Sequence, residues 1–189
     1  TTLRMDNNAF GSNVAAVRCI AAGFRTNTTL QVLGLNNCEL DDQGLSILAE
    51  SLGQHKRSLQ SLFLCRNQIT GTGLHALVSN ATAALSTVTK LVLCNNSLFD
   101  EGATFLAETL RLQTLPSLTH LHSDHCDISD DGLVALLSAL EENETLEYLD
   151  LQRNAFRIQG YMALASSLPN IKELREIDYS WTTSDPTVM

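Results

Sequence analysis

Four residues between positions 120 and 125 have side chains that could bind a metal ion or change charge near neutral pH. They are His120, His122, Asp124 and His125. Alternate side chains of a β-strand point to the same side, so His120, His122 and Asp124 would share one face. Two kinds of chemistry are open to such a cluster. It could bind zinc, with Cys65 and Cys94 as further ligands, or form a pH-sensitive contact, because imidazole titrates near neutrality.

The common catalytic patterns are missing from this sequence. It has no glycine-rich phosphate loop, no nucleophile elbow and no His-Glu-x-x-His pattern. His122 and Asp150 could form a base and its orienting carboxylate, but no nucleophile accompanies them. The sequence also lacks a Cys-x-x-Cys pair that would strengthen a zinc site. We therefore expect no enzymatic activity, no metal and no cofactor.

The histidine cluster lies within one of several copies of the pattern Leu-x-x-Leu-x-Leu-x-x-Asn/Cys-x-Leu. The clearest copy covers residues 146–156, and the other full copies cover residues 30–40, 59–69, 88–98 and 118–128. The Asn/Cys position recurs after 28 to 30 residues, at Asn8, Cys38, Asn67, Asn96, Cys126 and Asn154. A regular period of this length indicates an array of structural repeats.

The second half of each copy predicts an amphipathic helix. In one copy, Leu45, Leu48 and Leu52 recur at helical spacing. A glycine stands at the same place near the start of most of these helices, at Gly44, Gly73, Gly102, Gly132 and Gly160. A strand followed by a helix in every unit resembles the ribonuclease-inhibitor-like class of leucine-rich repeats. That class includes ribonuclease inhibitors and the sensor region of nucleotide-binding leucine-rich-repeat receptors.

This resemblance covers roughly residues 1–180 and implies an α/β fold. The expected architecture is a right-handed α/β solenoid, the leucine-rich repeat horseshoe. A parallel sheet would line its concave face, and helices would cover its convex face. We predict a single leucine-rich repeat domain over residues 1–181 and a polar tail over residues 182–189. The chain opens within a repeat at Thr1, so we expect about six and a half repeats belonging to a longer protein.

The charge balance narrows the class of partner. The net charge is −9, and binding to nucleic acid or to an anionic membrane surface depends on lysine and arginine. No apolar run approaches the roughly 20 residues that a membrane span needs, and no signal-peptide pattern opens the chain. We therefore expect a protein partner, and neither a nucleic acid nor a membrane.

The cysteines predict the cellular compartment. Five of them are spread at about one per repeat, and Cys38 and Cys126 occupy the Asn/Cys position, where we expect buried free thiols. Free thiols favour a reducing compartment, hence the cytoplasm. Four Asn-x-Ser/Thr sequons point towards secretion instead, but chance produces several in a chain this rich in Asn, Ser and Thr.

The residues between the frame leucines should face away from the core, on the concave face. They are apolar in the first half of the chain and charged or hydrogen-bonding in the second half. Exposed apolar and aromatic residues and arginines concentrate binding energy at interfaces, although parallel sheets favour Val and Phe in any case. The predicted partner-binding residues are Val32, Phe63, Val92, His120, His122, Asp124, His125, Tyr148, Asp150, Arg153, Asp178 and Trp181.

From the resemblance we expect a protein–protein interaction scaffold that binds a protein partner on its concave face. Two alternatives stay open. One is a GTPase-activating or regulatory module acting on a small GTPase, as in the Ran-directed members of the class. The other is a structural or cytoskeleton-associated element. Weak self-association through the uncapped ends of the array is a further expectation, because unpaired edge strands can pair with other copies.

Overall fold

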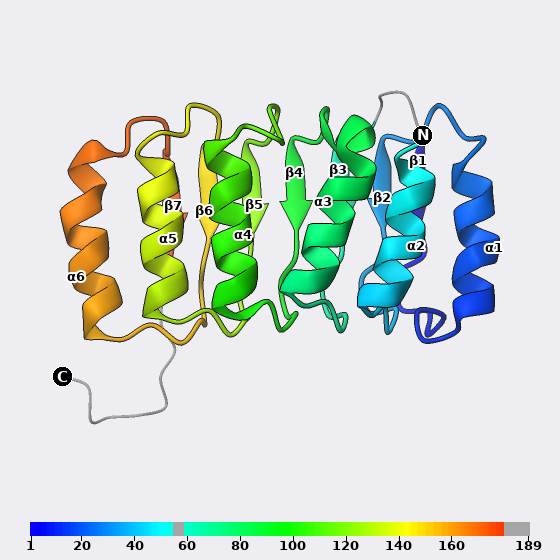
Figure 1. The fold of residues 1–189 in the computed structure, drawn as a ribbon, viewed down its shortest axis with the longest axis horizontal. Helices are drawn as coiled ribbons and strands as arrows, with labels where there is room; N and C mark the ends of the chain where they lie inside the picture. The colour runs from blue at the N-terminus through cyan, green and yellow to red at the C-terminus, as the bar shows by residue number, and fades with distance from the viewer. Residues whose placement is uncertain (55–58, 180–189) are drawn as a thin grey trace.

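The computed structural model describes residues 1–54 and 59–179. Within those residues, seven short strands alternate with six α-helices (Figure 1). The strands are β1 (Thr2–Arg4), β2 (Val32–Gly34), β3 (Ser61–Phe63), β4 (Lys90–Val92), β5 (His120–His122), β6 (Tyr148–Asp150) and β7 (Glu176–Asp178). The helices are α1 (Val14–Phe24), α2 (Asp42–Leu52), α3 (Gly71–Leu85), α4 (Phe99–Arg111), α5 (Asp130–Leu140), α6 (Ile158–Ser167) and the short 3-10 helix η1 (Leu168–Asn170).

The strands pair in parallel and in sequence order, from β1 to β7, in one open sheet. Equivalent repeat positions lie side by side, as Leu62 lies between Leu33 and Leu91. The helices form one layer in front of the sheet in Figure 1, so they cover one of its faces. This is the predicted α/β solenoid. The uncovered face of the sheet is called the concave face below, and the helical side the convex face.

The hydrophobic core lies between the sheet and the helices. The middle residue of each inner strand, such as Leu62 or Leu121, is fully buried. On the helical side, Leu45, Leu48 and Ala49 of α2 are fully buried as well. Each unit therefore buries its apolar surface against its neighbours, which is why such an array is stable only as a stack.

The Asn/Cys position joins one repeat to the next by hydrogen bonds. The Asn67 side-chain oxygen accepts from the backbone N–H groups of Cys38 and Leu40, both at 3.0 Å. Its Nδ2 donates to the carbonyl oxygens of Leu35 and Leu64, both at 2.8 Å. These groups are buried, and a buried backbone group without a partner is costly. The asparagine therefore stabilises two adjacent turns at once.

Cys38 and Cys126 occupy this position in two repeats. Both are fully buried and unpaired, which confirms the prediction of buried free thiols. Burial raises the pKa of the Cys126 thiol to about 12, so the sulfur stays protonated and unreactive. A small thiol can fill the position because its sulfur takes over part of the donor role of the asparagine Nδ2. The Cys126 Sγ donates to the carbonyl oxygens of Leu93 and Asp124, both at 3.4 Å.

A second series of contacts joins the starts of neighbouring helices. Asp42, Asp100 and Asp130, each near the start of a helix, accept hydrogen bonds from the start of the following helix. Asp42 accepts from the Thr70 N–H at 2.8 Å, and Asp100 from the Ser129 N–H at 2.7 Å. The equivalent position in α3 is Gly71, and the next helix, α4, has no side-chain cap.

Ser123 occupies a position where the repeat pattern has leucine. It is fully buried, and its hydroxyl donates to the Asp150 carbonyl at 3.3 Å. That contact offsets part of the cost of burying a hydroxyl group.

Among the described helices, none combines the length and the apolar character needed to cross a membrane. The predicted tail, residues 182–189, lies outside the described part of the chain.

Candidate functional site: the concave face of the sheet

Two rows of side chains lie on the concave face, because the first and third residues of each strand point away from the core. The register builds the first row from Thr2, Val32, Ser61, Lys90, His120, Tyr148 and Glu176. It builds the second row from Arg4, Gly34, Phe63, Val92, His122, Asp150 and Asp178.

The predicted apolar patch divides between these rows. Phe63 and Val92 are register partners in the second row. Val32 pairs with Ser61 in the first row, so it does not pair with either of them. Val92 is buried, whereas Phe63 remains partly exposed. Phe63 therefore offers a partly exposed aromatic ring to a partner, whereas Val92 does not offer its side chain.

Arg4 reaches Phe63 across an intervening strand. The Arg4 guanidinium carbon lies 5.1 Å from the centre of the Phe63 ring, a distance typical of a cation–π contact. Gly34 is the register partner of both residues and has no side chain. Asp6 lies 3.6 Å from the guanidinium as well. Arg4 and Asp6 were not among the predicted site residues.

Cys65 and Cys94 are joined by a disulfide bond between the segments that follow β3 and β4, with their Cα atoms 4.6 Å apart. Both residues are partly exposed beside the second row. A disulfide offers no thiolate, which is the form of cysteine that binds metal. Zinc binding by these two sulfurs together with the histidines is therefore not available to the bonded pair.

Tyr148 joins the histidine cluster to the next strand. Its ring stacks near His120, with ring centres 5.8 Å apart, and tilts against His122, with centres 4.9 Å apart. The Nδ1 atom of His122 lies 3.5 Å from an Asp150 carboxylate oxygen. The His120 Nδ1 is held by the Thr119 hydroxyl at 2.9 Å. The structure thus brings together His120, His122, Tyr148 and Asp150, as the sequence predicted.

Three other predicted residues surround this group. His125 lies 3.5 Å from an Asp124 carboxylate oxygen, measured from its Nδ1. The Gln152 side-chain amide donates a hydrogen bond to the Asp178 carboxylate. Gln152 was not among the predicted site residues, although it follows β6 on the same face.

Arg153 and His125 occupy equivalent turn positions with positive φ, 55° and 51°. Arg153 is exposed there, and no described contact links it to the Tyr148 group. Trp181, which was predicted to extend the site, lies outside the described residues.

The electrostatics of the Tyr148 group show carboxylates packed closely together. Burial raises the pKa of Asp150, and the nearby charges of Asp124 and Asp178 raise it further. Burial also raises the pKa of Tyr148, together with the carboxylates around it. Burial and the charge of Lys90 lower the pKa of His122 despite the opposing effect of Asp150.

The His122 Nε2 atom accounts for part of this preference for the neutral ring. It is buried and has no hydrogen-bond partner among the described residues. A charged imidazole carries an N–H on both nitrogens, so protonation would bury one of them without an acceptor. The group is therefore a neutral imidazole beside closely spaced carboxylates, an arrangement suited to attract a positive charge from outside.

Comparisons with known proteins agree with the repeat pattern. The family described as "Leucine Rich repeat" matches residues 26–49, 114–137 and 142–165. "NACHT, LRR and PYD domains-containing protein 14" of Mus musculus is 34% identical over 168 residues, covering 86% of this chain and 16% of that protein. "Ribonuclease inhibitor" of Mus musculus is 29% identical over 145 residues, covering 77% of this chain and 31% of that protein.

Among solved structures, "Leiomodin-1 Actin-Binding Site 2 (ABS2)" matches with a TM-score of 0.48 and 18% identity, covering 90% of this chain and 79% of that one. A likeness this distant says nothing about what the chain binds. The chain spans about a sixth of the length of the first relative, as the 16% coverage states. Its repeating leucine frame, its Asn/Cys ladder and these matches show that the chain belongs to the leucine-rich repeat proteins, in the ribonuclease-inhibitor-like class.

Proposed function

We propose that this protein-binding repeat array holds a protein partner on its concave face, across β3 to β7. The observation that carries the proposal is the Tyr148 group. A partly exposed aromatic ring lies there against two imidazoles of the neighbouring strand, beside buried and partly buried carboxylates. Aromatic residues that a partner can desolvate contribute much of the energy of protein interfaces. A ribonuclease inhibitor, by its name, acts on another protein, which supports a protein partner for this chain as well.

The side chains on the concave face favour a partner that offers one basic side chain and one apolar side chain. Burial raises the pKa of the Tyr148 hydroxyl, and the negative charges around it raise that pKa further; they belong to Asp150, Asp178, Glu176 and Asp124. A lysine or arginine would relieve their mutual repulsion and could lie against the Tyr148 ring. Phe63, two strands away from β5, would take an apolar side chain. The net charge of −9 adds long-range attraction for such a partner.

A binding role, without enzymatic activity, fits this arrangement. His122 and Asp150 are 3.5 Å apart. The neighbouring Ser123 hydroxyl is buried and donates to the Asp150 backbone carbonyl, so it lies on the core side of the strand and not beside the imidazole as a nucleophile. We also propose a cytoplasmic location, supported by the two free buried thiols. The partly exposed Cys65–Cys94 bond is open to reduction there.

Site-specific photo-crosslinking in cells tests the face directly. A photoreactive amino acid would replace Ser61 on the concave face in one protein and Val134, which is 48% exposed on α5, in another. We expect a specific protein to be captured from position 61 and not from position 134. The double variant Phe63→Ala/Tyr148→Ala should lose this capture while keeping its unfolding midpoint within a few degrees of the parent. Capture from position 134 alone, or capture unaffected by the double variant, contradicts the proposal.

The captured protein also decides between the general role and the two narrower ones. A small GTPase would support the regulatory alternative, and its hydrolysis rate would then be measured with and without the array. A filament protein would support the structural alternative, which predicts co-sedimentation with the assembled filament.

A further inference from the structure

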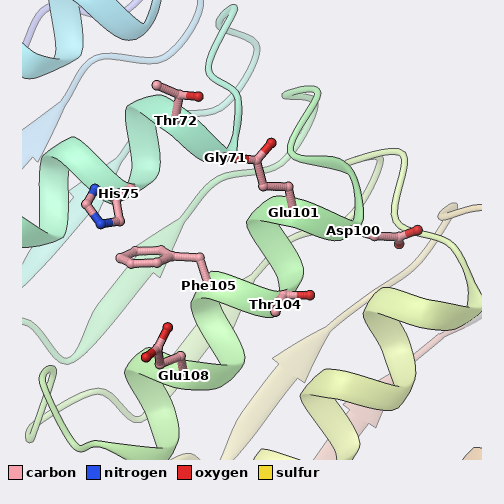
Figure 2. Close-up of a pocket in the computed structure, with 8 residues that line it drawn as sticks. All are labelled: Gly71, Thr72, His75, Asp100, Glu101, Thr104, Phe105 and Glu108. Carbon is pink, nitrogen blue, oxygen red and sulfur yellow. The ribbon is translucent and has the colours of Figure 1, made fainter.

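Helices α3 and α4 border an open cavity on the convex face, on the other side of the sheet from the Tyr148 group. Its volume is about 550 Å³. Figure 2 shows its lining side chains on the two facing helices, with the Phe105 ring directed from α4 towards His75 of α3. The two rings lie 4.8 Å apart between centres and form an aromatic wall. Phe105 is only partly buried.

The start of α3, which lines this cavity, differs from the starts of the neighbouring helices. Where α2, α4 and α5 carry an aspartate, α3 carries Gly71. Because Gly71 has no side chain, the first turns of α3 and α4 can approach each other closely through their backbones. A Cβ on Gly71 would lie 2.9 Å from the Gly102 nitrogen. Further along the two helices, the side chains of His75 and Phe105 line the open space (Figure 2).

The charged side chains that line the cavity are all carboxylates. Glu101 and Glu108 lie four residues before and three residues after Phe105, so all three share one face of α4. Both carboxylates are exposed, and neither forms an ion pair within residues 1–54 and 59–179. Asp100 also lines the cavity, but its carboxylate already accepts from Ser129 and Gly132. No lysine or arginine is among the lining residues.

We propose that this cavity binds an arginine side chain from a segment of a partner protein. A guanidinium is planar and weakly hydrated, so it can stack on the exposed part of the Phe105 ring. Its five N–H groups can donate to the Glu101 and Glu108 carboxylates on either side. The aromatic wall selects a flat cation, and the two unpaired carboxylates exclude an anion. This second contact surface lies on the convex face and is independent of the function proposed for the concave face.

The proposal can be tested by NMR titration of the isotope-labelled chain with a blocked peptide, acetyl-Gly-Arg-Gly-amide. The neutral comparison is the same peptide with citrulline, which keeps the shape of arginine and removes its charge. We expect the arginine peptide to shift the amide signals of Thr72, His75, Glu101 and Phe105. The citrulline peptide should leave them in place. Equal shifts with both peptides, or shifts confined to other parts of the chain, overturn the proposal.

Three variants locate the contact. Glu101→Gln/Glu108→Gln should weaken peptide binding by about tenfold or more, because the guanidinium would then donate to two neutral amide oxygens instead of two carboxylates. Glu142→Gln/Glu144→Gln removes the same charge from an exposed turn after α5 and should weaken binding less than twofold. Phe105→Leu should reduce the preference for arginine over a lysine peptide. If both glutamine variants lose the same peptide affinity, the peptide is attracted only by the overall negative charge. If Glu101→Gln/Glu108→Gln binds the peptide as well as the parent does, the proposed site is wrong.

Discussion

The Arg4 guanidinium lies 5.1 Å from the centre of the Phe63 ring although β1 and β3 are not adjacent strands. Gly34 on β2 stands between them and leaves the space open. A Cβ on Gly34 would approach the Asp6 carboxylate oxygens to 3.0 Å and the Arg4 Cγ to 3.1 Å. A missing side chain in one repeat thus allows a contact between the two repeats on either side.

Replacing Gly34 by valine should separate Arg4 from Phe63. The neighbours that must move are side-chain atoms of Asp6 and Arg4, so the fold should persist, with a loss of about 1 kcal/mol or less from the cation–π contact. The measurement is the ring-current shift of the Arg4 side-chain protons. That shift should disappear in Gly34→Val and in Phe63→Leu. A shift that survives in both variants would mean that the two residues do not meet in solution.

Replacing Gly71 by alanine should destabilise the array by about 1 to 3 kcal/mol, because the new methyl group is forced against the backbone of α4. The matched control is Gly23→Ala, at a helical glycine whose Cβ would meet nothing within 4 Å. That change should stabilise the array by up to about 1 kcal/mol through helix propensity. Urea unfolding of both variants is the measurement. The same sign for both changes would contradict the close approach of α3 and α4.

Replacing Asn67 by alanine should cost about 3 kcal/mol or more, because it leaves several buried backbone groups without partners. Asn67→Cys should cost clearly less, since Cys38 and Cys126 fill the same position in other repeats. Both values come from urea unfolding at equilibrium. If the cysteine variant is as unstable as the alanine variant, a thiol does not replace the asparagine side chain at this position.

The Cys65–Cys94 bond closes a loop with a sequence separation of 29 residues. Loop closure of this size should stabilise the oxidised array by roughly 3 kcal/mol. Cys65→Ser/Cys94→Ser should therefore unfold at lower urea concentration than the oxidised parent, and at a similar concentration to the reduced parent. Differential alkylation in cells would show both cysteines as thiols if the chain works in the cytoplasm. If the parent protein unfolds at the same urea concentration with and without reductant, the disulfide bond is absent in solution.

The stability of the array should fall as the pH falls through the range in which histidine titrates. The pKa of His122 is lowered by burial and by Lys90, so the unfolded chain takes up a proton at a pH where the folded chain does not. The contribution of His122 to the free energy of unfolding is then fully present above the pKa of histidine in the unfolded chain, near 6.5, and it declines as the pH falls below that value. Asp150 acts in the opposite direction at lower pH, because its pKa is raised and protonation favours the folded form there.

His122→Gln isolates this effect. From about pH 7.5 to about pH 5.5, the variant should lose less stability than the parent, because glutamine does not titrate. His75→Gln, on the convex face, serves as the comparison. Parallel stability curves for the parent and His122→Gln would show that His122 titrates as it does in the unfolded chain.

Several parts of this molecule could be predicted from the sequence because they repeat. The frame leucines, the helical spacing of residues such as Leu45 and Leu48, and the Asn/Cys position recur from unit to unit, so each copy supports the others. The grouping of His120, His122, Tyr148 and Asp150 could also be predicted. It requires only that β5 and β6 are parallel neighbours in the repeat register, and that register follows from the period.

The features that could not be predicted depend on what one repeat lacks relative to the next. The Arg4–Phe63 contact exists because Gly34 leaves a gap. The cavity beside His75 and Phe105 is lined by Gly71, which stands where other repeats have an aspartate. The sequence by itself determined the solenoid and the residues of its concave face, since alternation along a strand is a local property. Only the tertiary structure decided which side chains of different repeats meet, because lateral packing depends on the space that each neighbour leaves.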